Sequence, residues 1–266
     1  TMKELLMLRW AAMAVAAVFE KKGINPQGVL IFEGSQGMGK TSWLKSLVAN
    51  DDWVQDGIHL NPNDKDTVLD VVGHWIVELG EIQATFRKSD IQALKGFITK
   101  GKDKIRPAYE RKPNMYVRRT VFFGTVDEKE FLTDKNGNRR FWTLNVTDVD
   151  AKHNVDMQQF WAQIHDMYLK GERWYLDREE IQELDKHNQV FMSVDPIDDI
   201  LEKCIQPSVE DNAFNVTEIL IMCGKQNPSK AQLNTAGKWL RNHGYKADRL
   251  KKYNLTAIVP KSLQRE

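Results

Sequence analysis

The octapeptide at residues 34–41, GSQGMGKT, constrains the fold of this chain more than any other stretch. It matches the phosphate-binding pattern G-x-x-x-x-G-K-[S/T] at every defined position. An apolar run at residues 29–32 precedes it and predicts a buried strand, and apolar residues at helical spacing follow it from Lys40 onward. Strand, glycine loop and helix together favour a nucleotide-binding P-loop over a chance match in a glycine-rich turn.

The loop predicts a site for ATP and a magnesium ion. Backbone N–H groups of such a loop point toward phosphates, and the following helix adds the positive end of its dipole. We expect Lys40 to reach the β and γ phosphates and Thr41 to bind Mg²⁺. The predicted ATP-binding residues are Gly34, Ser35, Gln36, Gly37, Met38, Gly39, Lys40 and Thr41.

Two glutamates lie at and just beyond the end of a second buried strand, which we predict at residues 74–78. Glu78 ends this strand and Glu81 comes three residues later. A P-loop enzyme that hydrolyses its nucleotide needs an acid for the metal and a group that orients or deprotonates water. We assign Glu78 to the metal and Glu81 to the base. The spacing leaves this division open, and a cap of the next helix is the alternative for Glu81.

Polar residues near two further strands complete the predicted site. Asp127 follows the third strand, at residues 119–125, where ligands of open α/β sheets bind, and can sense the terminal phosphate. Arg139 and Arg140 follow a tight turn and can supply a finger to a neighbouring subunit's nucleotide. Successive strand residues point opposite ways, so we expect only one to do so. A surface ion pair with Asp134 is the alternative.

The order of elements predicts the fold class. A fourth strand is predicted at residues 139–146, and helical patterns cover residues 157–169 and 179–191. Strands that alternate with helices indicate an α/β fold whose mostly parallel sheet is covered on both faces, a three-layer P-loop core.

Composition limits the kinds of site and compartment that we expect. The chain has 38 basic and 37 acidic residues, so its total charge indicates neither a nucleic acid nor a membrane. Its two cysteines form no CxxC pair, which argues against a zinc site or a disulfide framework and favours the reducing cytoplasm. The apolar run at residues 10–19 is shorter than the roughly 20 residues that span a bilayer. We therefore expect a buried helix there and no membrane partner.

Five stretches, in this order, resemble the virulence-associated protein E family: EGSQGMGKT, WIVELGEI, LKGFITKGKDKIRPAYER, RRTVFFGT and DKNGNRRFW. These proteins are P-loop ATPases of phages and mobile genetic elements, similar to superfamily 3 helicases of the AAA+ class. The resemblance runs from about residue 2 to residue 195. It implies an AAA+-like core, a homo-oligomeric ring with ATP hydrolysed at subunit interfaces, a role in DNA replication, and a primase domain upstream or a primase partner.

The resemblance also implies roles for single residues. Relatives carry a basic hairpin between the acidic strand and the sensor strand that lines the pore of the ring. In this chain the residues of that hairpin that would bind phosphates of single-stranded DNA are Lys102, Lys104, Arg106 and Arg111. A solvated charged loop is the alternative. Relatives have GTTN at the sensor, whereas this chain has Val126 and Asp127, which puts the rate of hydrolysis in doubt.

A second domain is predicted at residues 195–266, after a core at residues 1–194. Residues 225–266 carry ten basic and two acidic residues, and Ser229 can cap a helix that ends near Gly244. That helix and a basic two-stranded wing after it resemble a winged-helix DNA-binding domain. Its predicted DNA contacts are Lys238, Arg241, Lys246 and Arg249. A docking domain with a solvated charged face is the alternative.

Three functions agree with these features. The first is an ATPase motor of the superfamily 3 helicase type, acting on DNA. The second is a DNA-binding replication initiator or helicase loader in which ATP switches assembly without strand separation. The third is a nucleotide or small-molecule kinase, which the basic C-terminal residues disfavour. We find no NKxD motif for guanine.

Overall fold

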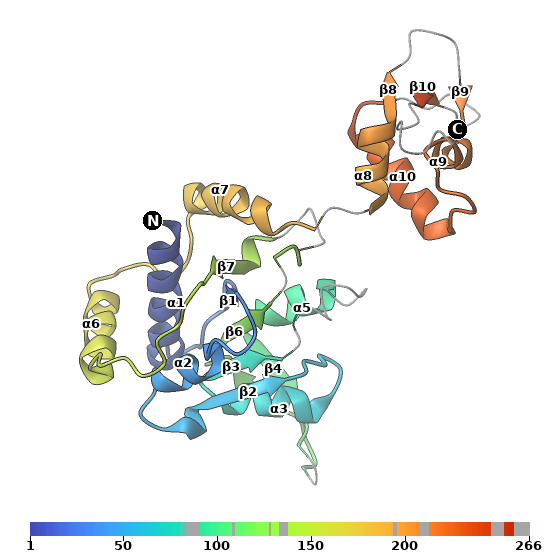
Figure 1. Ribbon diagram of the computed structural model, residues 1–266. Coiled ribbons are helices and arrows are strands. Elements are labelled where there is room, and N and C mark those ends of the chain that lie inside the picture. The colour runs from blue at the N-terminus through green and yellow to red at the C-terminus, as the bar shows by residue number, and fades with distance from the viewer. Residues whose placement is uncertain are drawn as a thin grey trace. The chain divides into compact units, whose positions relative to one another are not determined.

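A computed structural model gives the structure of the chain (Figure 1). It describes residues 1–80, 82, 91–107, 110–127, 129–132, 138–193, 196–207, 213–245 and 253–257. The chain divides into two compact units, Thr1–Ser193 and Val194–Glu266. Among the described residues, no helix has both the length and the apolar character needed to cross a bilayer.

The first unit is built on a parallel five-stranded sheet with the order β2-β3-β6-β1-β7. Its strands are β1 (Val29–Glu33), β2 (Val54–Ile58), β3 (Ile76–Leu79), β6 (Val121–Val126) and β7 (Phe141–Asn145). The four strands predicted from sequence are all present, with ends shifted by one to two residues. β2 is not predicted, because its sequence VQDGI has apolar residues only at its two ends and it lies at the sheet edge.

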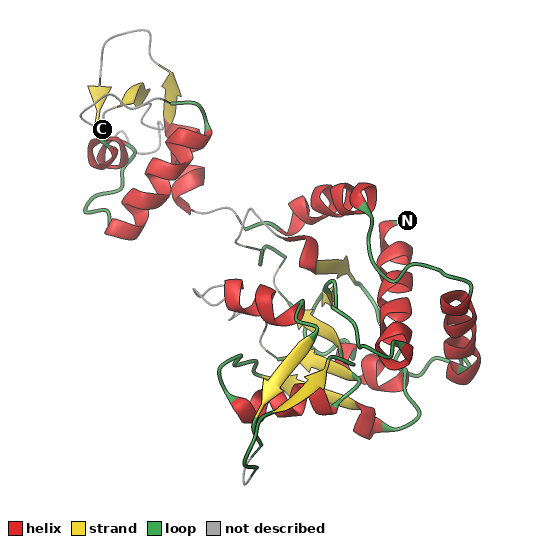
Figure 2. Cartoon of the chain, turned by 180° about the vertical axis from the view of Figure 1, so that it is seen from behind, coloured by secondary structure: helices red, strands yellow, loops and turns green. Residues whose placement is uncertain are grey.

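Helices cover both faces of this sheet, as predicted (Figure 2). Val29 and Ile31 belong to the core on one face, with side chains of α3 and α5, and Leu30 and Phe32 belong to the core on the other, with α1, α2 and α7. This division follows from the two-residue period of a strand. The helices are α1 (Met2–Phe19), α2 (Lys40–Ser46), α3 (Lys65–Gly73), α5 (Ile91–Ile98), α6 (Met157–Leu169) and α7 (Arg178–His187). Short 3₁₀ turns lie at Asp51–Trp53, Asn138–Arg140 and Asn188–Phe191.

A two-stranded antiparallel hairpin lies between β3 and β6 in the chain. Its strands are β4 (Lys102–Ile105) and β5 (Asn114–Val117). A buried ion pair anchors its base, where Arg118 donates to Asp103 Oδ2 at 2.5 and 3.0 Å. Both side chains are almost fully excluded from solvent. The hairpin expected from the family resemblance is therefore present.

The second unit has its own core around Leu201, Leu220 and Leu240. It contains α8 (Pro196–Cys204), β8 (Ile205–Pro207), β9 (Ala213–Phe214), α9 (Val216–Met222), α10 (Lys230–Asn242) and β10 (Tyr253–Ala257). Ser229 caps α10 as predicted, and Gly244 follows it with φ +82°. β10 pairs antiparallel with β8 and β9, which lie between α8 and α9 in the chain, rather than with a strand in its own predicted wing. Residues 246–252 of that wing lie outside the described residues.

Candidate nucleotide-binding site

The glycine loop lies between β1 and α2, and close packing explains its glycines. A Cβ atom at Gly34 would collide with the carbonyl oxygen of Val146. Gly37 and Gly39 have φ of +82° and +80°, a conformation that L-residues with side chains rarely adopt. The N–H of Gly34 donates to Val126 O at 3.0 Å, which joins the loop to the end of β6. The loop is thus held at the carboxyl edge of the sheet.

Lys40 is buried beneath the loop that it follows. Its ammonium donates to the carbonyl oxygens of Gly34 at 2.5 Å and Ser35 at 3.0 Å. Burial lowers the pKa of Lys40, and the carboxylates of Asp127, Glu33 and Glu78 oppose that shift. The positive charge is therefore placed where phosphates on the loop would meet it.

Thr41 and Glu78 come together although 37 residues separate them. Thr41 Oγ1 donates to Glu78 Oε1 at 2.9 Å, and Thr125 Oγ1 donates to the same oxygen at 3.4 Å. Glu78 is only 4% exposed, and burial raises its pKa, while the Thr41 hydroxyl acts in the opposite direction. β6 lies between β1 and β3, so the ends of these three strands place the three side chains at one point.

A hydroxyl beside a buried carboxylate fits Mg²⁺, which prefers oxygen ligands. Within the described part of the chain, no group of three or more His, Cys, Asp and Glu side chains could hold a metal ion. Mg²⁺ commonly uses one or two carboxylates together with substrate phosphates and water. Thr41 and Glu78 fit such a shared site. The predicted base, Glu81, lies outside the described residues.

A cavity of about 520 Å³ opens over the loop. Its lining combines the loop and the start of α2 with Thr125, Val126 and Asp127 at the end of β6. The structure therefore places the predicted sensor, Asp127, beside the predicted phosphate loop. The cavity is within the range of about 300–1,000 Å³ typical of ligand sites.

Arg139 and Arg140 lie at the amino ends of the strands, opposite the phosphate loop. They directly precede β7, which runs parallel to β1 with Phe141 paired to Val29. β1 has five residues, and the phosphate loop follows the last of them. At about 3.3 Å per strand residue, the whole length of β1 lies between the two arginines and this loop. They line a polar cavity of about 310 Å³ with Asn25, Gln27 and Thr99.

The two arginines differ in their surroundings. Arg139 is exposed, whereas Arg140 is half-buried and its Nε atom is buried without a hydrogen-bond partner. Burial lowers the pKa of Arg140, and the charge of Arg139 adds to the shift. Asp134, the alternative partner, lies outside the described residues. Neither arginine can contact the phosphate loop of its own chain.

The predicted DNA-binding residues fall into two separate groups. Lys102 and Lys104 project from the exposed side of the hairpin, and Arg106 and Arg111 are exposed near its far end. Lys238 and Arg241 are exposed on α10. Lys246 and Arg249 lie outside the described residues. The structure thus places Lys102 and Lys104 on the same side of the hairpin.

Sequence reasoning missed two residues of these sites. Met115 is 60% exposed and pairs in register with Lys104, so it shares the lysine side of the hairpin. Glu33 is buried at the end of β1 and accepts a hydrogen bond from Asn145 Nδ2. Position at the end of a buried strand was the signal for Glu33, whereas nothing local marks Met115.

Two solved structures are similar to this chain. The C-terminal region of NrS-1 (305–718, A form, apo) is 16% identical over 95% of this chain and 70% of its own, with a TM-score of 0.44. SCCmec type IV Cch, described as an active helicase, is 12% identical over 96% of this chain and 67% of its own, with a TM-score of 0.42. No curated protein sequence matches the chain.

The family assignment comes from the first unit. Residues 1–193 match the model of the virulence-associated protein E-like domain, and these residues contain the phosphate loop, Glu78 and the hairpin. The chain belongs to the virulence-associated protein E-like domain family.

Proposed function

We propose that this chain is a magnesium-dependent ATPase of the superfamily 3 helicase type, which acts on DNA in the replication of a phage or mobile element. The observation that carries the proposal is the hydrogen bond of 2.9 Å between Thr41 and Glu78 at the end of a complete phosphate loop. Membership of the virulence-associated protein E-like family supports the same conclusion.

Each residue of the site has a role that follows from its position. Loop N–H groups and Lys40 bind the triphosphate, and Thr41 and Glu78 hold the metal. A bound Mg²⁺ would neutralise charge that develops on the phosphates. Asp127 faces the same cavity and orients groups at the terminal phosphate, and Glu81 serves as the base that activates water.

Hydrolysis at subunit interfaces explains the position of the two arginines. Because Arg139 and Arg140 lie at the edge opposite their own loop, they can act only on the nucleotide of a neighbour. Arg139 is exposed, so its guanidinium can reach an anion outside its own chain. A homo-oligomeric ring places such an arginine at each nucleotide.

DNA contacts come from the hairpin and from the second unit. Exposed lysines on one side of a hairpin suit sequence-independent binding of phosphates. α10, with exposed Lys238 and Arg241, would serve as the DNA-contacting helix of a winged-helix domain. A small-molecule kinase has no use for either feature.

The deciding experiment measures ATP hydrolysis by the purified chain with and without single-stranded DNA, together with particle mass. We expect DNA to raise turnover and Lys40→Ala to reduce it by on the order of 10²–10³-fold, the loss typical of one transition-state contact. Turnover that requires no Lys40 would contradict the proposal.

The second candidate is a replication initiator or loader that ATP switches without strand separation. Asp127 favours it, because an ionised carboxylate cannot donate a hydrogen bond to a phosphate or to water. In that case ATP would change DNA affinity or particle mass, and the rate of ATP hydrolysis would be the same with and without DNA.

A further inference from the structure

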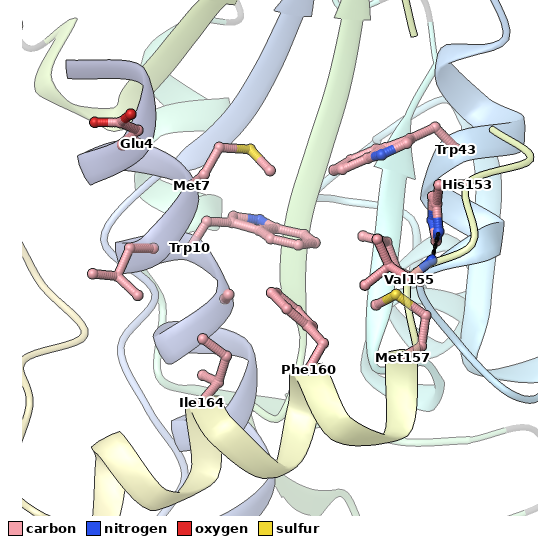
Figure 3. A pocket seen from close by; sticks show the side chains of 12 residues that line it. Glu4, Met7, Trp10, Trp43, His153, Val155, Met157, Phe160 and Ile164 are labelled. Carbon is pink, nitrogen blue, oxygen red and sulfur yellow. Dashed lines mark hydrogen bonds between the residues drawn. The ribbon is translucent and has the colours of Figure 1, made fainter. Parts of the chain in front are cut away.

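A second cavity, of about 440 Å³, lies beside the helix that follows the phosphate loop. α1 contributes Met7 and Trp10 to its wall, α2 contributes Trp43, and α6 contributes Phe160 (Figure 3). The proposed function uses none of these side chains. Trp10 and Trp43 belong to the core on one face of the sheet and also line this cavity.

α2 connects this cavity directly to the phosphate loop. The N–H of Trp43 donates to Gly39 O at 2.8 Å, so the tryptophan begins one turn beyond the loop. With a helical rise of 1.5 Å per residue, Trp43 lies about 4.5 Å along the axis from Lys40. The Trp43 indole packs on Phe32, which lies two residues before the loop, with ring centroids 4.8 Å apart.

The segment after β7 makes a second connection. Ala151 Cβ lies 3.9 Å from the position of a Cβ atom at Gly39, beside the phosphate loop. Two residues later, His153 Nε2 lies 2.9 Å from Ser46 Oγ on α2, and His153 and Val155 then line the cavity. Residues 151–155 thus connect the phosphate loop with the cavity.

The wall of the cavity is aromatic and offers few hydrogen bonds. Trp10 Nε1 already donates to Phe122 O at 2.8 Å. Both ring nitrogens of His153 are engaged, since Nδ1 accepts from the Val155 N–H at 3.4 Å and Nε2 meets Ser46. Glu4 lies at one end of the group of side chains (Figure 3). Aromatic faces with few free polar groups suit a flat heteroaromatic ring.

We propose that this cavity holds the base of the nucleotide whose phosphates lie on residues 34–41. The inference rests on the proposed function and adds the recognition of the base. Stacking on aromatic side chains strengthens binding on the order of 10- to 100-fold over the triphosphate alone. A pocket that does not hydrogen-bond the edge of its ligand discriminates weakly between bases. ATP and GTP should therefore bind within about tenfold of each other.

The test compares the affinities of ATP, GTP and tripolyphosphate, each with Mg²⁺, for the full chain by calorimetry. Phe160→Ala removes one wall, and Ala11→Leu fills the cavity from α1. Both should weaken ATP about tenfold and leave tripolyphosphate unchanged. Phe19→Ala is the matched control, because Phe19 is an aromatic residue of α1 that stacks on His165 and does not line the cavity.

The outcomes separate the inference from the function on which it rests. Equal affinities for ATP and tripolyphosphate in the unaltered chain overturn the inference and leave the phosphate site intact. The same holds if both cavity variants keep the ATP preference. If Lys40→Ala leaves the binding of both ligands unchanged, the proposed function fails and the inference fails with it. Thermal unfolding of each variant shows whether a loss of affinity reflects a loss of fold.

Discussion

At the scale of single residues, Glu78 illustrates the conflict between folding and binding. A carboxylate that is 4% exposed loses hydration when it ionises, and one hydroxyl bond of 2.9 Å compensates only in part. Its raised pKa means that the folded chain retains this proton to higher pH than the unfolded chain. A bound cation would favour the ionised form.

Replacing Glu78 by Gln should stabilise the chain and abolish its chemistry. The folded pKa is raised, so ionisation destabilises the native state as pH rises above 4.5, the ordinary pKa of a glutamate, and below that pH the penalty disappears. We expect the variant to have a higher Tm than the unaltered chain at pH 7.5, with the difference vanishing at pH 4. ATP turnover should fall by roughly 10²–10³-fold. A lower Tm at pH 7.5 would contradict this account.

The buried pair at the hairpin base should be the most sensitive ionic contact. Arg118 is fully buried, donates to Asp103 and lies 4.4 Å from the Phe97 ring centroid. Asp103→Ala leaves a buried charge without its partner, which should reduce the free energy of unfolding by about 3–5 kcal/mol in urea titrations. Lys100 also contacts Asp103 but is 51% exposed, so Lys100→Ala should reduce it by less than about 1 kcal/mol. If both substitutions reduce the free energy of unfolding equally, burial of the ion pair is not the cause of the loss.

At the scale of elements, the hairpin combines two kinds of contact on one side. Lys102 and Lys104 present charge, and Met115 presents an apolar side chain in register with Lys104. Charge contacts with phosphates release counterions and depend on salt, whereas contacts of an apolar side chain with a base or sugar do not.

Single-stranded DNA affinity, measured at several salt concentrations, should separate these contacts. Lys104→Ala should reduce the slope of log affinity against log salt by about 0.7, the value for one phosphate of a single strand. Met115→Ala should lower affinity at every salt concentration by a few-fold and leave the slope unchanged. If neither variant changes binding, the hairpin does not contact DNA. A change of slope with Met115→Ala would mean that the variant disturbs the lysines.

At the scale of the whole molecule, the sheet separates two halves of the proposed catalytic site. The phosphate loop follows β1 at one edge, and Arg139 and Arg140 precede β7 at the other. In a closed ring of identical subunits, the phosphate loop of one subunit can meet only the arginines of a neighbouring subunit.

Mixing two inactive variants tests this arrangement. Lys40→Ala removes the loop function, and the double variant Arg139→Ala with Arg140→Ala removes the finger. Each alone should have little ATPase activity. An equal mixture should recover about a quarter of the unaltered rate, since random assembly joins an intact loop to intact arginines at one interface in four. If subunits exchange and activity does not return, the arginines do not act between subunits.

Local patterns in the sequence determined the parts of this protein that depend on neighbouring residues. The loop at residues 34–41, the strand before it, the helix after it and the bounds of α6 follow from glycine positions and apolar spacing. Ser229 likewise identifies the start of α10, because capping is a contact between residues three apart. β2 was missed because an edge strand buries too little to leave an apolar pattern.

Only the tertiary structure decided how these parts combine. The strand order places Thr41 against Glu78 and puts Arg139 and Arg140 at the far edge of the sheet. It also shows that Trp43 of α2 and Phe160 of α6 share a cavity. Such pairs lie tens of residues apart, and their contact depends on which strands become neighbours. Periodicity along the chain determines which face of an element is buried, but not which element covers that face.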